Sequence, residues 1–557
     1  MSKRPNVAII GAGFAGLRCA DILIQNGADV TIFEARDRVG GRVHQCKAGE
    51  HLLDMGPNWI HGAGANPILD IANKTGTTYA EFEGGQAVFG TDGKVVDQAV
   101  VERVSDVLWV TIEEAFKFSN AQMEEIPAEK SLLDFIREKL VDSSLNEQEQ
   151  KMVLDSARLW GAYVGDPIER QSLKFFSLEE SIDGSNYFVA STYKDILKHV
   201  SATALQQADI RLNQPITRIN SKPVTQDADS TKPRENKVTL TTQSGESHTF
   251  DEVVVTCPLG WLKRNKEAFT PALPPRLSTA IDSISYGRLE KVYITFPSAF
   301  WNSGTGPENE NGNENPVGLP TAATANVSNT APPKPTLNTD EKRGNKISFM
   351  QFLNPTYHTN HPADIPWEQQ SFSLASLPDH VAHPTLLFYI YGPAATYIVN
   401  ELASLSPSSL PSNSPTKPQA YEPSTPQYTF LTTLFAPFYS LLPNYTPTSP
   451  VCIPTFTTPT TWQLDPCAGH GSYTNFQVGL SDGNRDIETL RSGAGMANRG
   501  VWFAGEHTAP FVALGTTTGA LWSGERAAGA LLGVYKLGNA GMRVGRDDSL
   551  PSGVERE

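Results

Sequence analysis

The sequence has few cysteines and no long apolar run. Its five cysteines are odd in number and widely spaced, which fits neither a disulfide framework nor a metal-binding cluster. Apolar segments such as residues 386–391 have the length of buried strands, well below the ~20 residues that cross a bilayer. These absences predict reduced thiols, no metal site and no membrane partner. The thiols are those of Cys19, Cys46, Cys257, Cys452 and Cys467.

Positive charge is also scarce. The chain carries 45 Lys and Arg against 60 Asp and Glu, which gives a formal net charge of −15 over 557 residues. Such a balance disfavours nucleic acid as a partner and raises the local concentration of cationic ligands. No pattern in the sequence indicates an oligomeric state.

Targeting signals are missing from the ends of the sequence. Residues 1–6 form a short polar lead into a strand pattern, and the segment after residue 536 is polar. The final residues do not form a peroxisomal tripeptide of the Ser-Lys-Leu type. We therefore expect a cytoplasmic protein whose residues 536–557 form a flexible tail.

A Gly-x-Gly-x-x-Gly turn near the start of the chain is its most informative feature. An apolar strand pattern at residues 7–10 precedes the turn, and a helical pattern and a second strand at 30–33 follow it. Gly11 permits the tight turn, Gly13 lets the backbone approach a pyrophosphate, and Gly16 lets helix and strand pack closely. This arrangement predicts a βαβ unit that binds a dinucleotide.

Glu34 stands at the end of the second strand, about 20 residues after the turn. A carboxylate at this position accepts a hydrogen bond from a ribose 2′-hydroxyl and repels a 2′-phosphate. A nicotinamide-dependent dehydrogenase is the generic alternative for this N-terminal motif. It leaves the C-terminal motif described below unexplained.

The rest of the chain alternates between folded patterns and two low-complexity insertions, at about residues 302–345 and 404–427. Apolar spacing predicts helices at 98–119, 131–140 and 147–161. Strand patterns occur at 210–213, 238–240, 252–258, 291–296, 347–352 and 385–391. At this length we expect an α/β protein with two domains, each built from discontinuous segments.

Three motifs together resemble the flavin-containing amine oxidase superfamily, and within it the polyamine and spermine oxidases. Residues 34–42 match Glu-Ala-Arg-x-Arg-x-Gly-Gly-Arg, residues 56–62 read Gly-Pro-Asn-Trp-Ile-His-Gly, and residues 503–508 read Phe-Ala-Gly-Glu-His-Thr. Residues 287–292 and 462–473 resemble further family segments. The resemblance extends from residue 6 to about 532, outside the two insertions.

The resemblance implies a Rossmann-like domain that binds FAD noncovalently, formed by residues 1–80, 200–290 and 460–535. It implies a second, α+β substrate domain with a mixed sheet flanked by helices, formed by residues 81–199 and 291–459. The residues expected at the ADP part of the cofactor are Gly11, Gly13, Gly16, Glu34, Arg36 and Arg42. Those expected near the flavin ring are Gly56, Asn58 and Trp59, with Ile216 and Thr256 at the adenosine and Glu506, Thr516 and Thr517 at the ribityl chain and ring edge.

Lys291 matches the lysine that, in the family, holds a water against flavin N5. A lysine at the start of a strand is otherwise an ordinary solvated charge. His61 is expected to face the substrate amine, where a group that can titrate near neutral pH could modulate substrate protonation; a packing histidine is the alternative. Trp462 is expected near the substrate, and Tyr473 is expected to form one aromatic wall of its site. Residues 515–518 lack a second aromatic wall and a flavin-linking cysteine, which argues against monoamine oxidases.

The resemblance implies oxidation of a polyamine or an N-acetylpolyamine. Hydride passes to flavin N5, the imine is hydrolysed to an aldehyde and an amine, and O₂ is reduced to H₂O₂. The candidates for holding distal ammonium groups are Glu179, Glu180 and Asp183. Three alternatives stay open: a histone lysine demethylase, an L-amino acid oxidase and a flavoprotein without turnover. The sequence does not choose among the polyamines or between the two sides of the amine.

Overall fold

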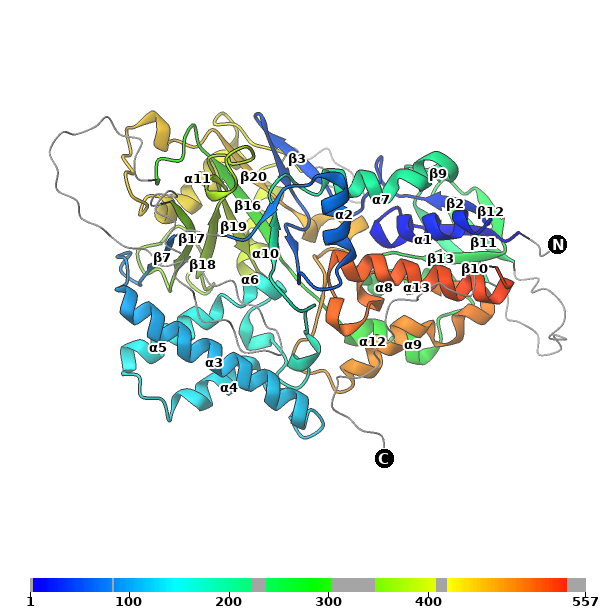
Figure 1. Ribbon diagram of the computed structural model, residues 1–557, viewed down its shortest axis with the longest axis horizontal. Helices are drawn as coiled ribbons and strands as arrows, with labels where there is room; N and C mark the ends of the chain where they lie inside the picture. The colour runs from blue at the N-terminus through cyan, green and yellow to red at the C-terminus, as the bar shows by residue number, and fades with distance from the viewer. Residues whose placement is uncertain (1–3, 83–84, 222–236, 303–345, 407–417, 538–557) are drawn as a thin grey trace.

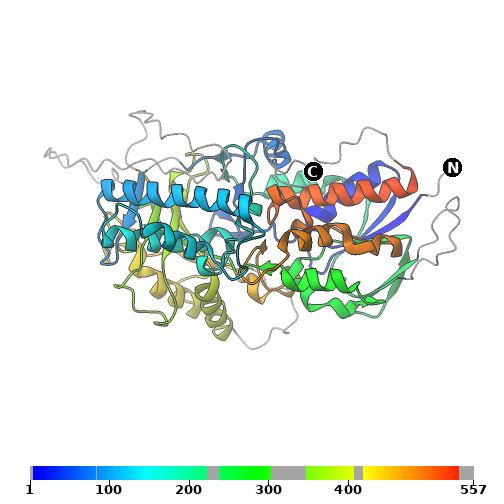
Figure 2. The same cartoon turned by 90° about the horizontal axis from the view of Figure 1, so that it is seen from below.

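The two lobes of the molecule follow one another along its long axis (Figure 1), each around its own sheet. Figure 2, turned by 90°, shows the same separation, with α3 in one lobe and α13 in the other. The computed structural model describes residues 4–82, 85–221, 237–302, 346–406 and 418–537. Most of the first insertion, part of the second and most of the expected tail lie outside these residues.

The first lobe is built on a five-stranded parallel sheet with the order β22-β13-β1-β2-β9. Its strands come from three distant parts of the chain, and all four pairings are parallel. The strands are β1 (Asn6–Ile10), β2 (Asp29–Phe33), β9 (Asp209–Arg211), β13 (Glu252–Val255) and β22 (Val501–Phe503). The N-terminal pattern of strand, glycine turn, helix and strand thus folds as a βαβ unit.

Helices cover one face of this sheet and a second sheet covers the other. The helices are α1 (Phe14–Gln25), α7 (Lys194–Gln207) and α13 (Thr517–Tyr535), and Figure 1 shows α13 beside α1. The second sheet contains β10 (Ile216–Ser221), β11 (Val238–Thr242), β12 (Ser247–Phe250) and β14 (Phe269–Thr270). Beyond it lie α8 (Leu259–Arg264), α9 (Pro275–Ser283) and α12 (Gly483–Ser492).

The second lobe is built on a six-stranded mixed sheet with the order β20-β16-β19-β18-β17-β7. All its pairings are antiparallel except the parallel pairing of β17 with β7. The strands are β7 (Gly85–Phe89), β16 (Glu290–Thr295), β17 (Ile347–Phe352), β18 (Gln369–Ser373), β19 (Thr385–Ile390) and β20 (Phe456–Pro459). Helices α10 (Gly392–Ser404) and α11 (Pro426–Tyr439) cover one face. The other face carries an aromatic cluster turned towards the first lobe.

The remaining helices of this lobe form a bundle below the sheet in Figure 1. They are α3 (Gln98–Gln122), α4 (Leu132–Leu140) and α5 (Glu147–Arg158), and the short helix α6 (Gly161–Val164) packs instead in the aromatic cluster on the sheet. Each of the first three starts at a side-chain cap, Asp97, Ser131 and Asn146 respectively, that accepts from the first free N–H groups. The expected helix at 147–161 ends three residues earlier, before a short break.

Small elements connect the lobes. Strands β5 (Trp59–Ile60), β6 (Tyr79–Ala80) and β8 (Tyr187–Val189) form one sheet, β3 (Gln45–Ala48) pairs with β4 (His51–Asp54), and β15 (Ser285–Tyr286) pairs with β21 (Thr474–Asn475). Helix α2 (Pro67–Thr75) follows β5.

The structure is of the mixed α/β class that the sequence predicts. One difference concerns the second insertion, because α11 begins within the range given for it. Thr425 caps this helix by accepting from the Tyr428 N–H, and Pro426 occupies its first turn, where no N–H donor is needed. Among the described helices, none combines the length and apolarity that crossing a membrane requires.

Candidate functional site

A cavity of about 1210 Å³ opens between the two lobes and contains nearly all of the predicted site residues. This exceeds the roughly 300–1,000 Å³ of a usual small-ligand pocket. The predicted residues on its wall are Gly11, Gly13, Glu34, Arg36, Arg42, Gly56, Asn58, Trp59, His61, Ile216, Thr256, Lys291, Trp462, Tyr473, Glu506, Thr516 and Thr517. Gly16 lies beneath the wall, packed against Gly11.

The three glycines of the N-terminal turn occupy different environments. Gly11 has a φ of +107°, which L side chains rarely adopt, and a β-carbon at Gly16 would clash with the Gly11 carbonyl oxygen. At Gly13 a β-carbon would meet no atom of the described residues within 4 Å. Thr256 fixes the turn, since its hydroxyl donates to the carbonyl oxygens of Ile10 at 2.8 Å and Gly11 at 3.1 Å.

Two helices begin at the cavity. Helix α1 starts at Gly13, which has no side chain to cap its first N–H groups, so these donors face the space beside the glycine. Helix α13 starts at Thr516, whose hydroxyl accepts from the Gly519 N–H at 3.0 Å. Uncapped donors at the positive end of a helix dipole suit the phosphates of a dinucleotide.

Glu34 and Arg36 are both engaged by protein groups. The Glu34 carboxylate accepts from the backbone N–H of Ala12 at 2.7 Å and of Arg36 at 2.8 Å. The Arg36 guanidinium binds both oxygens of Asp465, at 2.7 and 3.1 Å. Both partners are at least 96 % buried, so this is a desolvated, bidentate ion pair. Asp465 belongs to the 462–473 segment, and sequence reasoning did not single it out.

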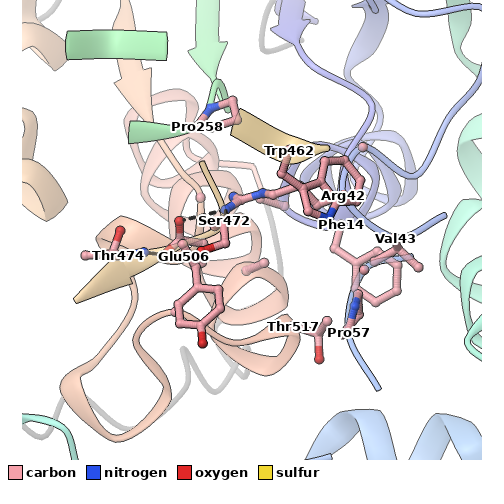
Figure 3. Close-up of a pocket in the computed structure, with 18 of the residues that line it drawn as sticks. Phe14, Arg42, Val43, Pro57, Pro258, Trp462, Ser472, Thr474, Glu506 and Thr517 are labelled. Carbon is pink, nitrogen blue, oxygen red and sulfur yellow. Dashed lines mark hydrogen bonds and ion pairs between the residues drawn. The ribbon is translucent and has the colours of Figure 1, made fainter. Parts of the chain in front are cut away.

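Arg42 lies among acceptors from the C-terminal part of the chain. It forms an ion pair with Glu506 at 3.0 Å and donates to the backbone carbonyl of Ser472 (Figure 3). Figure 3 shows Trp462 beside Arg42, with Phe14, Pro57 and Thr517 on the same wall. The segments expected to hold the two ends of a cofactor therefore meet here.

A chain of hydrogen bonds fixes Asn58 and Trp59. The Trp59 indole donates to the Tyr389 hydroxyl at 3.1 Å, and that hydroxyl donates to the Asn58 side chain at 2.9 Å. Asn58 in turn donates to the Tyr293 hydroxyl at 3.2 Å. Because Tyr293 and Tyr389 come from neighbouring strands, the six-stranded sheet positions this segment of the other lobe.

Lys291 is buried, with 5 % of its surface exposed, yet it reaches the cavity. Its ammonium group donates to the backbone carbonyls of Asp54 and Gly56. Burial lowers the pKa of Lys291, while the negative charges of Asp54 and Glu290 partly oppose this shift. Burial raises the pKa of the Asp54 carboxyl. The lysine is therefore a buried group on the cavity wall and not a solvated surface charge.

Glu290 fixes the segment that carries Trp462. Its carboxylate accepts from the backbone N–H groups of Trp462 at 3.0 Å and Gln463 at 2.9 Å. Burial raises the pKa of Glu290 to about 7. The Trp462 indole donates to the Met55 carbonyl at 3.2 Å, so the ring is held against the segment that also contacts Lys291.

Tyr473 stands on the wall next to Gly515. Its hydroxyl donates to the backbone carbonyl of Tyr163, which also lines the cavity. A β-carbon at Gly515 would lie 3.4 Å from the Tyr473 ring, so the glycine leaves that face open. Burial raises the pKa of the Tyr473 hydroxyl, so the phenol stays neutral.

His61 lines the cavity, with its ring accessible from within. Its deep position lowers the pKa of the imidazole, and a hydrogen bond from its ring to Asn186 opposes this. Asn186 also accepts from the Gly62 N–H at 3.0 Å. Desolvation disfavours the imidazolium, whereas the hydrogen bond to Asn186 favours it.

Two of the three acidic candidates, Glu179 and Glu180, line the cavity, and Asp183 is not among the described residues that do so. Glu179 accepts from the Phe476 N–H and from Gln171, each at 3.1 Å, and burial raises its pKa to about 7. Glu180 makes no hydrogen bond or ion pair within the described part of the chain, and burial raises its pKa as well.

A family model for flavin containing amine oxidoreductase matches residues 14–356 and 440–532. The chain belongs to this family. Its cofactor is FAD, and the cavity fits it: the uncapped start of α1 and the open face of Gly13 suit a pyrophosphate, while Glu34 retains acceptor capacity for a ribose. Within the described residues no group of three His, Cys, Asp or Glu could hold a metal ion.

Curated relatives of the chain are named as polyamine oxidases and as a histone demethylase. The chain is 26 % identical over 312 residues to "Probable polyamine oxidase 4" of Arabidopsis thaliana, covering 54 % of this chain and 59 % of the relative. It is 28 % identical over 312 residues to "Polyamine oxidase 4" of Oryza sativa subsp. japonica, covering 53 % and 60 %. It is 26 % identical over 308 residues to "Lysine-specific histone demethylase 1B" of Mus musculus, covering 54 % and 35 %. The matches to the two polyamine oxidases thus span about three fifths of each relative's length.

Proposed function

We propose that this flavin amine oxidoreductase is a polyamine oxidase. Its reaction converts a secondary amine, O₂ and water into an aldehyde, a smaller amine and H₂O₂. Bound FAD supplies the redox chemistry, because it takes a hydride from the carbon next to nitrogen and passes the electrons to O₂. The remaining tasks fall to the protein: it must hold the amine, favour its neutral form and manage protons.

The observation that carries this proposal is the position of Lys291 in the same cavity as the dinucleotide turn. A buried lysine with a lowered pKa can hold a water molecule and exchange a proton near neutral pH. The carbonyls of Asp54 and Gly56 fix its ammonium group. In the family that this chain resembles, the matching lysine holds a water against flavin N5, which supports this role.

The cavity wall around Lys291 favours a neutral reacting nitrogen. Trp59, Trp462 and Tyr473 supply aromatic faces, which attract a cationic amine as it enters. Once the amine lies against these rings, loss of hydration lowers its pKa and increases the fraction with a free lone pair. In its neutral form, the His61 ring can accept a hydrogen bond from the same amine.

Glu179 and Glu180 suit the second positive charge of a polyamine. A monoamine has no group for these carboxylates, whereas a polyamine has one several carbons from the reacting nitrogen. Glu180, which is free of partners in the described residues, would form the new ion pair. An incoming ammonium would also restore the ionised form of Glu179 against the effect of burial.

We also propose the division of the chain into domains. Residues 1–80, 200–290 and 460–535 would form the FAD-binding domain, which is consistent with the origin of the parallel strands. Residues 81–199 and 291–459 would form the substrate domain, around the mixed sheet. The cavity between them would then place the flavin ring at the junction.

The test is to purify the yellow holoenzyme and to measure peroxide with a matched substrate panel, identifying the aldehyde by mass spectrometry. Spermine, spermidine and their N-acetyl forms should react, and benzylamine, L-amino acids and a dimethyl-lysine histone peptide should not. Reaction confined to the histone peptide would indicate a demethylase instead. A holoenzyme whose flavin keeps its colour anaerobically with every amine would contradict the proposal.

A further inference from the structure

A glutamine on β18 faces the cavity without a protein partner. Gln370 is 2 % exposed and lines the cavity, yet its side-chain oxygen has no hydrogen-bond partner among the described residues. Buried carboxamides are normally satisfied, because an unmet polar group in a protein interior costs free energy. An unpartnered carboxamide on a cavity wall is therefore available to a ligand.

The register of the sheet places Gln370 in one row with the candidate catalytic lysine. Lys291 on β16 pairs with Tyr389 on β19, and Gln370 on β18 pairs with Gln351 on β17. Since β18 pairs with β19 at Ser371 and Phe388, Gln370 lies beside Tyr389 on the same face. Gln370 and Lys291 are thus two strands apart, about 10 Å at the usual strand spacing.

The neighbours of Gln370 on the cavity wall are aromatic, and Glu368, two residues before it, is not among the described residues that line the cavity and forms an ion pair with Arg158 at 3.6 Å. Phe372, two residues along the same face, contacts the rings of Phe349 at 4.8 Å and Tyr389 at 5.8 Å. A charged ammonium placed here would lose its hydration and find a neutral partner, which is unfavourable. A neutral polar group that carries a small apolar substituent would fit these surroundings.

We propose that Gln370 recognises an amide at one end of the substrate, so that the preferred substrates are N-acetylated polyamines. An acetamide has one acceptor and one donor, which match the donor and the acceptor of the glutamine side chain. An ammonium only donates hydrogen bonds, so the N–H group of the glutamine side chain would have no acceptor. This assignment rests on the polyamine oxidase function proposed above.

The two ends of such a substrate differ, and so do the two regions of the cavity wall. Glu179, next to the Phe476 backbone, and Glu180 would take the free ammonium end. Gln370, on the six-stranded sheet, would take the acetyl end. The methylene arm of an aminopropyl or aminobutyl group is of the length needed to connect the acetamide to a nitrogen held near Lys291.

The decisive measurement compares N¹-acetylspermine with spermine on the dithionite-reduced holoenzyme under nitrogen, where neither ligand can be oxidised. Isothermal titration calorimetry should show tighter binding of N¹-acetylspermine to the wild type. Gln370→Leu should weaken that ligand about tenfold, through the loss of two hydrogen bonds, and change spermine binding less than twofold. Gln370→Glu should reverse the preference, because its carboxylate favours an ammonium.

Gln369→Leu is the matched control. Gln369 is the preceding residue on the same strand, is 1 % exposed and also has an unpartnered side-chain oxygen, but it points to the opposite face of the sheet. This variant should bind both ligands as the wild type does. Gln370→Asn, which withdraws the carboxamide by one methylene, gives a second test if the leucine variant loses its flavin.

The outcomes separate the two proposals. If both ligands bind and are oxidised in air, but the ratio of their dissociation constants is the same in wild type and Gln370→Leu, the assignment of Gln370 is wrong and the polyamine oxidase function stands. If spermine binds more tightly than N¹-acetylspermine in the wild type, the assignment is likewise overturned. If neither ligand binds and no peroxide forms, both proposals fail.

Discussion

The two ends of the cavity are built by different means. At the dinucleotide end, the wall consists largely of backbone from one short stretch, with Gly11 and Gly13 at the turn and α1 beginning there. At the substrate end, the wall consists of side chains such as Lys291 and Gln370, which come from strands far apart in the sequence. A site built from backbone depends on open space and on particular backbone angles. A site built from side chains depends on which strands lie next to one another in the sheet.

This contrast leads to different sensitivities to mutation. Adding a methyl group at Gly16, beneath the turn at the dinucleotide end, forces backbone atoms apart, so the fold itself is at risk. Exchanging a polar group at the substrate end leaves the sheet in place and changes only chemistry or selectivity. The following predictions test this difference, beginning with the largest effect.

Gly16→Ala should cause the largest loss. Its β-carbon would clash with the Gly11 carbonyl oxygen, which is backbone and cannot move aside. The β-carbon would lie 2.1 Å from that oxygen, which is far closer than the overpacking that usually costs about 1–3 kcal/mol, and it also opens the turn that receives the cofactor. We expect little folded holoprotein, measured by the flavin absorbance per protein and by the thermal unfolding temperature.

Gly13→Ala is the control for this variant. Its β-carbon would meet no described atom within 4 Å, so the apoprotein should unfold at the wild-type temperature. Only its affinity for FAD should fall, because the methyl group enters the space for the pyrophosphate. If Gly13→Ala unfolds as readily as Gly16→Ala, the distinction between packing and cofactor glycines is wrong.

The sequence predicts the dinucleotide end well because its signals are local. Strand, turn and helix follow one another within residues 7–33, and their periodicity does not depend on distant segments. The substrate end depends on sheet register. One contact at the dinucleotide end is also invisible to local patterns, because the pairing of Arg36 with Asp465 joins residues 429 positions apart.

The side chains around Lys291 illustrate the same limit. Their strands are recognisable from apolar runs, and Lys291 itself was found through a family motif. The hydrogen bond between Tyr389 and Asn58 was not predicted, because it requires β19 and the segment just before β5 to come together from distant parts of the sequence. Gln370 was not predicted for the same reason. The face of the sheet on which it lies follows from its pairing with Gln351, which the sequence does not show.

Asp465→Asn should show the second largest effect. It leaves the Arg36 guanidinium buried without a charged partner, and breaking a buried pair in this way costs about 3–5 kcal/mol. Urea unfolding of the apoprotein should show a corresponding drop in the free energy of unfolding. Asp482→Asn, at a pair in which both side chains are 42 % exposed, should change it by less than about 1 kcal/mol.

Lys291→Met should retain the fold and the flavin but slow turnover about 100-fold, the low end of the usual effect of a proton-transfer group. Anaerobic and aerobic rapid mixing would show whether flavin reduction or reoxidation is slowed. Lys174→Met is the matched control, because Lys174 is 8 % exposed and donates to backbone carbonyls outside the cavity. Equal rates in Lys291→Met and wild type would refute the assigned role.

The smallest effect expected is a pH dependence from Glu179. Burial raises its pKa to about 7, so it is neutral below that pH and negative above it. Attraction for a distal ammonium should therefore grow as the pH rises through 7, and kcat/KM for a polyamine should rise several-fold between pH 6 and 8. Glu179→Gln should remove this rise, whereas Asp183→Asn should keep it.

Stability should change with pH in the opposite sense. Because the folded-state pKa of Glu179 lies above its unfolded value, its contribution to stability is present in full at low pH and is lost as the pH rises through about 7. Glu179→Gln should therefore raise the unfolding temperature at pH 8 relative to wild type more than at pH 5. If Glu179→Gln raises the unfolding temperature more at pH 5 than at pH 8, Glu179 is a structural carboxylate that is ionised in the folded protein. It is then not a group that becomes charged to bind substrate.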